Sequence, residues 1–511
     1  MKVLDAAAAA ALIPAGATIA VSGGGYRAEA ESVIKAVADR YVKERQPAGV
    51  TLVAVAMVER SRGGVGGAGT GLNRISQEGL VTRLIAGSFS RAPDREINHL
   101  IRSNKAAAYN LPMGTIVQLL RAIAAGRNGL VTPVGIGTFV DPRSEGGRAN
   151  AAADKPLSQI IDVVGEEMLF YPRFDVNVGL IKASAADERG NLYMDREAFD
   201  HGLIDVAMAA RSCRGTVIAE VNRMVKRGEL PARMVRVPGG MVDVVVVASE
   251  PPFEDEQAPV LIGDSIVDLP PPSQDMRIRD LISTLALEQL PHGAFVNLGA
   301  GIPMYDVPEA ARRNGRDDLY FTVEQGPMGG WPQVGGVSRN PEAIMGQLEV
   351  FDFYEGGGPD VSILSFGEID RTGSVNVSRF GTMMPGCGGF PNIGHGLRHL
   401  VLCGTLTAGG LKQKMSAGRL EIVQEGRIKR FVEKVEQVTF NAPIALSRGH
   451  KITVITERGV FSVGKDGYRL EAVAPGIDIA RDILKQVEFP IAVPDKLRVL
   501  PEALFMVGGG D

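Results

Sequence analysis

Cysteine is scarce in this chain of 511 residues, and its distribution excludes a fold held together by disulfides. The three cysteines, Cys213, Cys387 and Cys403, are odd in number and widely spaced, which fits a protein of the reducing cytoplasm. The metal-binding patterns CxxC and HExxH do not occur, and the six histidines are scattered. We therefore expect no metal site.

Blocks of lysine and arginine are also missing, and the net charge is −4, so nothing supports binding to nucleic acid or to an anionic membrane. The apolar residues 241–249 are interrupted by Asp243 and are too short to span a bilayer. The apolar start at residues 6–13 resembles a signal peptide. Because Asp5 precedes it and Pro14 follows, a short capped helix is the better interpretation.

Glycine, in contrast, is abundant at 63 residues and falls in clusters, which indicates functional loops. A chain of this length exceeds what one hydrophobic core supports, so two or more domains are expected. Residues 251–275 carry two proline clusters and several acids, a composition typical of a linker. We predict one domain over residues 1–250, this linker, and a second domain over residues 276–511.

The two halves repeat one plan. A Pro-X-Gly turn precedes a strand that ends in glycines at residues 14–24 and again at residues 291–301. An Asp-Val pair leads to a Gly-Asn or Gly-Ser turn at residues 175–191 and again at residues 360–374. Chance similarity is the alternative, but the order of the landmarks is kept. We predict an α/β fold with two related open α/β domains that arose by internal duplication and pack around a shared cleft.

Local patterns predict the elements of the first half. Strands are expected at 17–22, 51–58, 175–183 and 216–221, helices at 27–42 and 116–125, and an interrupted helix at 74–103. Residues 206–210 fit either a strand or a helix. The glycines at 23–25 lack the GxGxxG spacing and a ribose-binding acid, so we do not expect a dinucleotide site.

One carboxylate, Glu324, lies between a strand pattern and a glycine-rich turn. Residues 320–323 are of strand type, and Gln325-Gly326-Pro327 follows the glutamate at once. The rim of an open α/β sheet is where ligands bind. Glu324 is therefore a candidate general acid or base, or a nucleophile, and a solvated surface carboxylate is the alternative. No histidine, lysine or cysteine lies within this stretch to act in its place.

Two loops of the second half are expected to converge on Glu324. The first covers residues 297–303 and the second residues 384–392. Glycines let a backbone approach a ligand closely and present N–H groups to an oxyanion or a phosphate. Taken alone, each loop is as compatible with a turn that only packs against its neighbours as with a loop that binds a ligand. Cys387 lies in the second loop and His395 and His399 follow it, and we interpret all three as packing residues.

Together these motifs resemble a family I coenzyme A transferase of the fused type, the type of the propionate and acetoacetate/acetate CoA-transferases. Residues 322–326 resemble the glutamate motif of that family, residues 297–303 its GxGxP loop, and residues 386–392 its glycine loop. In the first half, residues 182–191 resemble the KAxxAD-x-x-GN signature, and residues 238–243 the proline-glycine strand start. The resemblance covers nearly the whole chain with its motifs in the expected order.

The resemblance implies a ping-pong transfer of CoA between short-chain or 3-oxo acids through a glutamyl-CoA thioester on Glu324. It implies acyl-CoA and small carboxylic acids as ligands, no tightly bound cofactor, a cytoplasmic enzyme, and a homodimer or homotetramer. Few aromatic residues, 5%, fit a small acyl pocket. The residues implied in the oxyanion or substrate site are Gly388, Gly389 and Met113. Those implied in CoA binding are Gly299, Ala300, Gly301, Ile302, Pro303, Gly386 and Asn392.

Met113 departs from the family pattern, which commonly places a glutamine of the oxyanion hole before the glycine of this turn. Because methionine cannot donate a hydrogen bond, our hypothesis is a hole built from the backbone N–H groups of Gly388 and Gly389. An acyl-CoA hydrolase on the same scaffold, and a non-catalytic sensor of CoA or phosphate ligands, are the alternative functions.

Overall fold

The computed structural model describes residues 1–24, 29–57, 61–62, 65–66, 70–90, 92, 94–249, 258–273, 276–333 and 335–506. The chain divides into two compact units. Unit 1 comprises Met1–Ser265, Ile344–Asp352 and Ser378–Asn392, and unit 2 comprises Ile266–Ala343, Phe353–Val377 and Ile393–Asp511. Two short segments of the second half thus belong to unit 1. The domain boundaries predicted above, and the shared cleft, stay predictions.

Unit 1 is built on a parallel sheet with helices on both faces. Its strands, in sheet order, are β1 (Lys2–Leu4), β15 (Val244–Val247), β13 (Thr216–Val225), β11 (Val178–Asp187), β2 (Thr18–Val21), β3 (Val50–Met57), β6 (Val81–Phe89) and β7 (Ala107–Asn110). All ten residues of β11 are buried, as expected for a strand covered on both faces.

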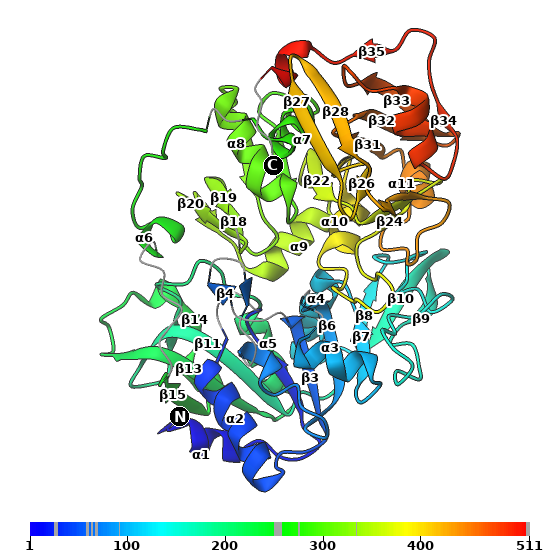
Figure 1. Ribbon diagram of the computed structural model, residues 1–511. Helices are drawn as coiled ribbons and strands as arrows, with labels where there is room; N and C mark the ends of the chain where they lie inside the picture. The colour runs from blue at the N-terminus through cyan, green and yellow to red at the C-terminus, as the bar shows by residue number, and fades with distance from the viewer. Residues whose placement is uncertain are drawn as a thin grey trace. The chain divides into compact units, whose positions relative to one another are not determined.

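The helices of unit 1 form two layers on this sheet. α1 (Ala6–Ala11), α2 (Glu31–Glu44) and α3 (Glu96–Arg102) share one buried core with the sheet, in which α2 crosses the strands (Figure 1). α4 (Met113–Ala124) and α5 (Leu203–Ser212) share a second core with the opposite face. The remaining elements of the first 265 residues are β4 (Ser61–Arg62), β5 (Val65–Gly66), β8 (Gly129–Thr132), β9 (Gln159–Val163), β10 (Glu166–Pro172), β12 (Leu192–Tyr193), β14 (Val235–Val237) and α6 (Ala258–Leu261).

Unit 2 repeats a parallel sheet and extends it with antiparallel strands. The sheet order is β18 (Pro327–Met328), β17 (Tyr320–Thr322), β16 (Phe295–Leu298), β22 (Val361–Ser365), β25 (His399–Cys403), β31 (Lys451–Thr456), β32 (Gly459–Gly464), β33 (Gly467–Val473) and β34 (Ile491–Ala492). α7 (Ile278–Leu287) and α8 (Ile302–Arg313) bury one face of this sheet.

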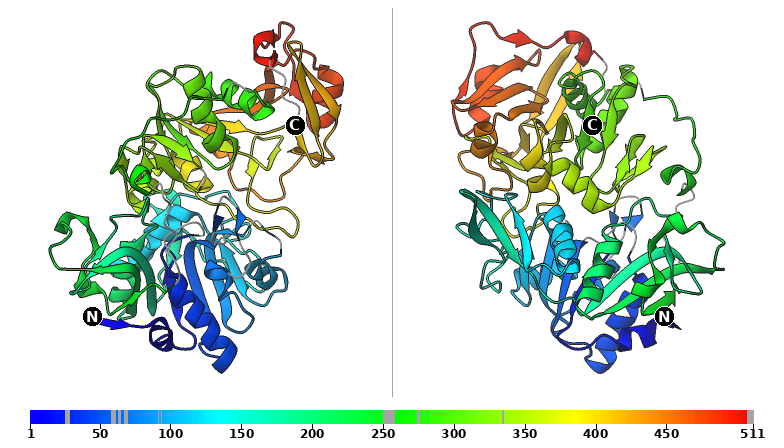
Figure 2. Two further views of the ribbon diagram at one scale, coloured as in Figure 1. Left: turned by 60° about the vertical axis from the view of Figure 1, so that its left-hand side comes forward. Right: turned by 180° about the vertical axis from the view of Figure 1, so that it is seen from behind.

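A long hairpin, β27 (Lys412–Ser416) and β28 (Arg419–Gln424), lies beside this sheet and adds Met415 and Leu420 to the same core (Figures 1 and 2). The other elements of the second half are β19 (Trp331–Gln333), β20 (Val337–Arg339), β21 (Ala343–Ile344), α9 (Gln347–Glu355), β23 (Glu368–Asp370), β24 (Val375–Asn376), α10 (Phe390–Gly396), β26 (Thr407–Ala408), β29 (Ile428–Lys429), β30 (Phe431–Val432), α11 (Ala442–Ser447) and β35 (Arg498–Val499).

The two units share a strand order, which supports the predicted duplication. The run β3-β2-β11-β13-β15 of unit 1 corresponds to the run β17-β16-β22-β25-β31 of unit 2, and every neighbouring pair in both runs is parallel. The turns before β2 and β16 each contain a left-handed glycine, with φ of 71° at Gly16 and 70° at Gly293. Glycine adopts this conformation without the steric cost of a Cβ atom.

Most predicted elements are confirmed, but one is wrong. Asp5 caps α1 by accepting the N–H of Ala8 at 2.7 Å, as its position before the alanine run predicted. The interrupted helix expected over residues 74–103 is instead strand β6 followed by the short helix α3. The error arose because β6 is buried between two helical layers, so its apolar run carries no alternation. Part of the expected linker, at residues 251–257 and 274–275, lies outside the described residues.

Candidate functional site

Glu324 lies at the tip of a tight hairpin on the rim of the unit 2 sheet. β17 ends at Thr322, and β18 returns antiparallel to it from Pro327. The turn is closed by the N–H of Gly326, which donates to the carbonyl of Val323 at 3.2 Å. Val323 is fully buried, whereas Glu324 is half-buried, so its carboxylate is held at the boundary between core and surface. The side-chain amide of Gln325 donates to Oε1 of Glu324 at 3.4 Å.

Buried polar side chains accompany Glu324 at this end of the sheet. Thr322 and Tyr354 share a hydrogen bond of 2.8 Å between their hydroxyl oxygens, and both side chains are almost inaccessible to solvent. Burial, with a further contribution from the charge of Glu324, raises the pKa of the Tyr354 phenol well above its usual range. The phenol therefore stays protonated and acts as a fixed dipole. Asn297 pairs with Thr322 across the neighbouring strands and is fully buried.

The predicted GxGxP loop lies at the same rim. β16 runs parallel to β17 and ends at Leu298, so the loop that follows leaves the sheet one strand away from the Glu324 hairpin. Gly299 donates its N–H to Ile363 at 2.9 Å, and Gly301, with φ of 97°, caps α8. Ile302 and Pro303 form the first turn of this helix, where proline is well tolerated because no N–H is needed. The N–H groups of Ala300 and Gly301 are used by none of the backbone hydrogen bonds among the described residues.

The predicted glycine loop belongs to unit 1, where it is bound to the end of β6. Gly388 donates its N–H to the carbonyl of Gly87 at 2.9 Å, and Phe89 donates to Pro385 at 2.9 Å. Gly386 has φ of 85°, and a Cβ atom there would lie 2.5 Å from the carbonyl oxygen of Gly87. The close approach of the two backbones therefore requires a glycine at this position.

The start of helix α4 is bound to the same loop. Met113 donates its N–H to the carbonyl of Gly388 at 3.0 Å, and Gly114 donates to Oδ1 of Asn392 at 3.1 Å. The side chain of Met113 is buried. The N–H of Gly389 takes part in none of the backbone hydrogen bonds among the described residues, whereas that of Gly388 is already occupied by Gly87.

Asn110, which is hydrogen-bonded to the glycine loop, is a site residue that sequence reasoning missed. It is buried at the end of β7, donates to the carbonyls of Ala86 and Gly87 at 2.8 Å each, and accepts the N–H of Cys387 at 2.9 Å. An asparagine in a strand is unfavourable unless its amide is used, which was the available signal. Cys387 is buried in the apolar core, as predicted for a packing residue.

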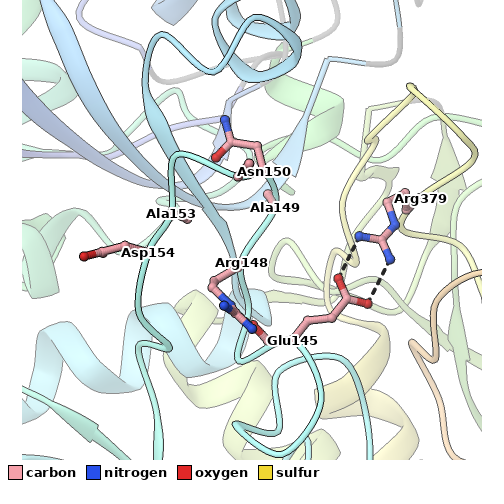
Figure 3. Close-up of a pocket in the computed structure, with 8 residues that line it drawn as sticks. Glu145, Arg148, Ala149, Asn150, Ala153, Asp154 and Arg379 are labelled. Atoms are coloured by element: carbon pink, nitrogen blue, oxygen red, sulfur yellow. Dashed lines mark hydrogen bonds and ion pairs between the residues drawn. The ribbon is translucent and has the colours of Figure 1, made fainter.

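An ion pair at the start of the 378–392 segment anchors it further. Arg379 makes a two-pronged contact with Glu145 at 2.7 and 2.9 Å, which Figure 3 shows at the edge of a polar cavity of about 400 Å³. Such two-pronged arginine–carboxylate contacts are stronger and more directional than single ones. Arg148 also lines this cavity and donates its Nε to the carbonyl of Glu145 at 2.7 Å. The cavity thus lies beside the base of the glycine loop.

The remaining candidate side chains have structural partners. Nε2 of His399 lies 2.9 Å from the Thr453 hydroxyl, and Nδ1 of His395 lies 3.0 Å from Arg448. Burial lowers the pKa of each imidazole to about 4. None of the three cysteines, all within the described residues, forms a disulfide. The described residues contain no cluster of His, Cys, Asp and Glu suited to a metal ion, and no helix long and apolar enough to cross a membrane.

Comparisons with known proteins agree on one family. The Coenzyme A transferase family model matches residues 3–248. Acetate CoA-transferase YdiF of Escherichia coli strain K12 is 37% identical over 99% of this chain and 95% of its own. Caffeate CoA-transferase of Acetobacterium woodii is 36% identical over 99% of this chain and 97% of its own. One similar solved structure is that of the acyl-CoA transferase YdiF of E. coli O157:H7, a thioester complex with CoA. It has a TM-score of 0.90 and 36% sequence identity, and the match covers 99% of this chain and 96% of that chain.

These similarities define the class of protein first: a two-domain α/β transferase that acts on coenzyme A esters. More narrowly, the chain belongs to the family I coenzyme A transferases, in the fused form that carries both halves on one chain. The family predicted from the Glu324 motif and the two glycine loops is thereby confirmed.

Proposed function

We propose that this enzyme transfers CoA from an acyl-CoA to a free short-chain carboxylate by a ping-pong mechanism, with Glu324 as the covalent carrier. The observation that carries the proposal is the position of Glu324: a half-buried carboxylate on a sheet rim, one strand from a glycine loop that opens a helix. Ligands bind at this end of open α/β sheets. The thioester complex of the similar YdiF structure supports the same chemistry.

The proposed chemistry has two acyl-transfer steps, the first at the thioester carbonyl carbon and the second at the glutamyl carbonyl carbon. A carboxylate oxygen of Glu324 attacks the thioester carbonyl of acyl-CoA, and the CoA thiolate leaves to give a mixed anhydride. The thiolate then attacks the glutamyl carbonyl, the acid leaves as a carboxylate, and CoA is held as a glutamyl thioester. An incoming carboxylate reverses both steps. A carboxylate is a poor nucleophile toward thioesters in water, so the site must position the reactants and exclude water.

We propose that the N–H of Gly389 stabilises the oxyanion that forms in these exchanges. Gly389 is buried, and its N–H makes no backbone hydrogen bond among the described residues, whereas the N–H of Gly388 donates to Gly87. A fixed backbone donor of this kind contributes about two orders of magnitude in rate. Met113, Gly386 and Asn392 support the donor by holding the loop in place.

For CoA binding we propose the loop from Gly299 to Pro303. The N–H groups of Ala300 and Gly301 precede the first turn of α8, a helix of 12 residues, and such groups attract the negative charge of phosphate or thiolate. Relatives named for acetate and caffeate are consistent with small carboxylic acids as acceptors. We further propose a cytoplasmic homo-oligomer without a tightly bound cofactor.

Steady-state kinetics with acetyl-CoA and propionate test this function. We expect parallel double-reciprocal lines, and Glu324→Gln should lose at least about 1,000-fold in kcat because no covalent carrier remains. Glu342→Gln is the control, since Glu342 is an exposed carboxylate that lies against Gly329 in the same hairpin region. Release of CoA at the same rate without any added acid would instead identify a hydrolase, and binding of acyl-CoA without turnover would identify a sensor.

A further inference from the structure

The polar cavity of about 400 Å³ in unit 1 is lined almost entirely by one short segment of the chain. Seven of its eight lining residues fall within residues 145–154, and the eighth is Arg379, in the segment that carries the glycine loop (Figure 3). Small-molecule sites are pockets of about 300–1,000 Å³ with a few well-placed polar groups, so this volume is sufficient for a ligand. None of the residues proposed above for CoA transfer is among these eight.

The lining segment is a fixed wall, because the side chain of Asn150 is hydrogen-bonded to the protein. Its amide nitrogen donates to the carbonyls of Ile101 and Ala106 at 2.8 Å each, and its amide oxygen accepts the N–H of Ala108 at 3.1 Å. Alanines at three further lining positions add little bulk. The cavity is therefore a feature of the folded segment, with an open interior and one anchored wall.

Arg148 is a lining cation whose charge no carboxylate of the described residues compensates. Its Nε donates to the carbonyl of Glu145 at 2.7 Å, which holds the guanidinium at the cavity. Its two terminal nitrogens make no hydrogen bond or ion pair with the residues that the structure describes. The carboxylate of Glu145 is compensated in turn by its two-pronged contact with Arg379. Because Arg148 is half-buried, water screens its charge less than that of a fully exposed arginine.

The remaining charged residue of the lining, Asp154, does not neutralise Arg148. Asp154 is exposed and forms no ion pair within the described part of the chain, and Figure 3 shows its carboxylate directed away from Arg148 and Arg379. Water and salt screen an exposed carboxylate of this kind. A half-buried guanidinium with two unused terminal nitrogens matches the planar fork of an oxyanion, either a carboxylate or a phosphate. The charges therefore select an anionic ligand.

Arg379 connects the cavity to the glycine loop. It lies near the start of the segment Ser378–Asn392, which returns to unit 1 and carries Gly389. Its anchor is Glu145, whose backbone carbonyl is held by Arg148. An anion bound by Arg148 therefore fixes the residue that holds the segment in place. A ligand that binds the docked form of a segment more tightly than the open form also stabilises the docked form.

We propose that Arg148 forms the anion contact of an effector site for a small carboxylate or phosphate, and that an anion bound in this cavity orders the glycine loop. The inference goes beyond the proposed CoA transfer and does not depend on it, because binding and loop order are measured without acyl-CoA. Removal of the guanidinium takes away a charge-assisted contact, so the Kd of the anion should rise at least about 10-fold in Arg148→Met.

Isothermal titration calorimetry with malonate and with inorganic phosphate, at constant ionic strength, tests the site. We expect at least one of the two to bind wild type, and its identity separates a carboxylate source from a phosphate source. Arg148→Met should weaken this binding by the factor given above. Ala151→Phe, which fills the cavity from an exposed position, should weaken it as well. Arg127→Met removes the same charge from an exposed arginine outside the lining and should bind like wild type.

Hydrogen exchange of residues 378–392, with and without the anion, tests the effect on the loop. The anion should slow exchange of this segment at least about 3-fold in wild type and leave it unchanged in Arg148→Met. Failure of both anions to bind wild type would overturn the proposal, as would binding that a folded Arg148→Met protein retains. Binding without slower exchange would overturn the effect on the loop. If Arg148→Met does not fold, as judged by its melting curve, the wild-type titration and Ala151→Phe decide.

Discussion

Asn110 illustrates at the scale of one residue how the site depends on a buried amide. Its three hydrogen bonds join the end of β6 to the glycine loop, through Ala86 and Gly87 on one side and Cys387 on the other. The carbonyls of Ala86 and Gly87 also accept the N–H groups of Leu111 and Gly388, so Asn110 adds a second donor to each of them. The residue touches no proposed reacting atom, and it acts by fixing the backbone that presents Gly389.

Asn110→Ala should therefore destabilise the protein and disorder the loop. The substitution removes three buried hydrogen bonds, a loss of about 2–4 kcal/mol in the free energy of unfolding. Urea denaturation measures the loss, and CoA-transfer rates should fall with it. Asn128→Ala is the control, because Asn128 is exposed. Equal stability of the two variants would show that the loop does not depend on this amide.

Met113→Gln tests the departure from the family pattern at the same scale. Cγ of Met113 would lie 2.5 Å from a Cβ atom on Gly87, so the side chain packs against backbone and is buried. A glutamine amide placed there has to find new partners, and we expect kcat for CoA transfer to fall about 10-fold. A rise in kcat would mean instead that the native site lacks an oxyanion donor which glutamine supplies.

At the scale of elements, the sequence predicted those with a local signal. The Asp5 cap, the buried strand β3 and the helix α4 were expected within a few residues of their observed bounds. Strand β6 was missed because its burial comes from tertiary packing on two faces, which removes the alternation that marks a strand. Glu324 and its neighbouring loop were identified from a strand-end pattern, because parallel strands bring their carboxyl ends to one rim.

The glycine loop provides an element-scale prediction with a matched control. Gly386→Ala and Gly381→Ala both place a side chain at a left-handed φ, of 85° and 57°, at similar local cost. A Cβ atom at 386 would in addition lie 2.5 Å from the Gly87 oxygen, whereas at 381 nothing lies within 4 Å. We expect kcat to fall at least about 10-fold for Gly386→Ala beyond the effect of Gly381→Ala. Equal kcat values would contradict the tight docking of the loop.

At the scale of the whole molecule, the proposed groups are divided between the two units. Glu324 and the 299–303 loop belong to unit 2, while Met113, Gly386, Gly389 and Asn392 belong to unit 1. The return of residues 378–392 to unit 1 could not be predicted, because nothing local in that segment states which sheet it joins. It follows from long-range contacts such as those of Asn110 and Arg379.

Acid stability is a property of the whole molecule that a buried histidine makes testable. The pKa of His201 is about 4 in the folded state, against 6.5 when unfolded. The unfolded state therefore binds more protons between these values, and stability is lost as the pH falls through this window. Between pH 7 and pH 4.5, wild type should lose about 2–3 kcal/mol more than His201→Phe in urea unfolding. His292→Phe, at an exposed histidine, should behave as wild type.

The central claim is that Glu324 carries CoA covalently, and mass spectrometry of the enzyme mixed with acyl-CoA alone tests it most directly. With no acceptor acid present, the account predicts a mass increase equal to bound CoA less one water, mapped by peptide analysis to Glu324 and absent from Glu324→Gln. An adduct on another residue, or full transfer activity with no adduct at any time, would contradict it.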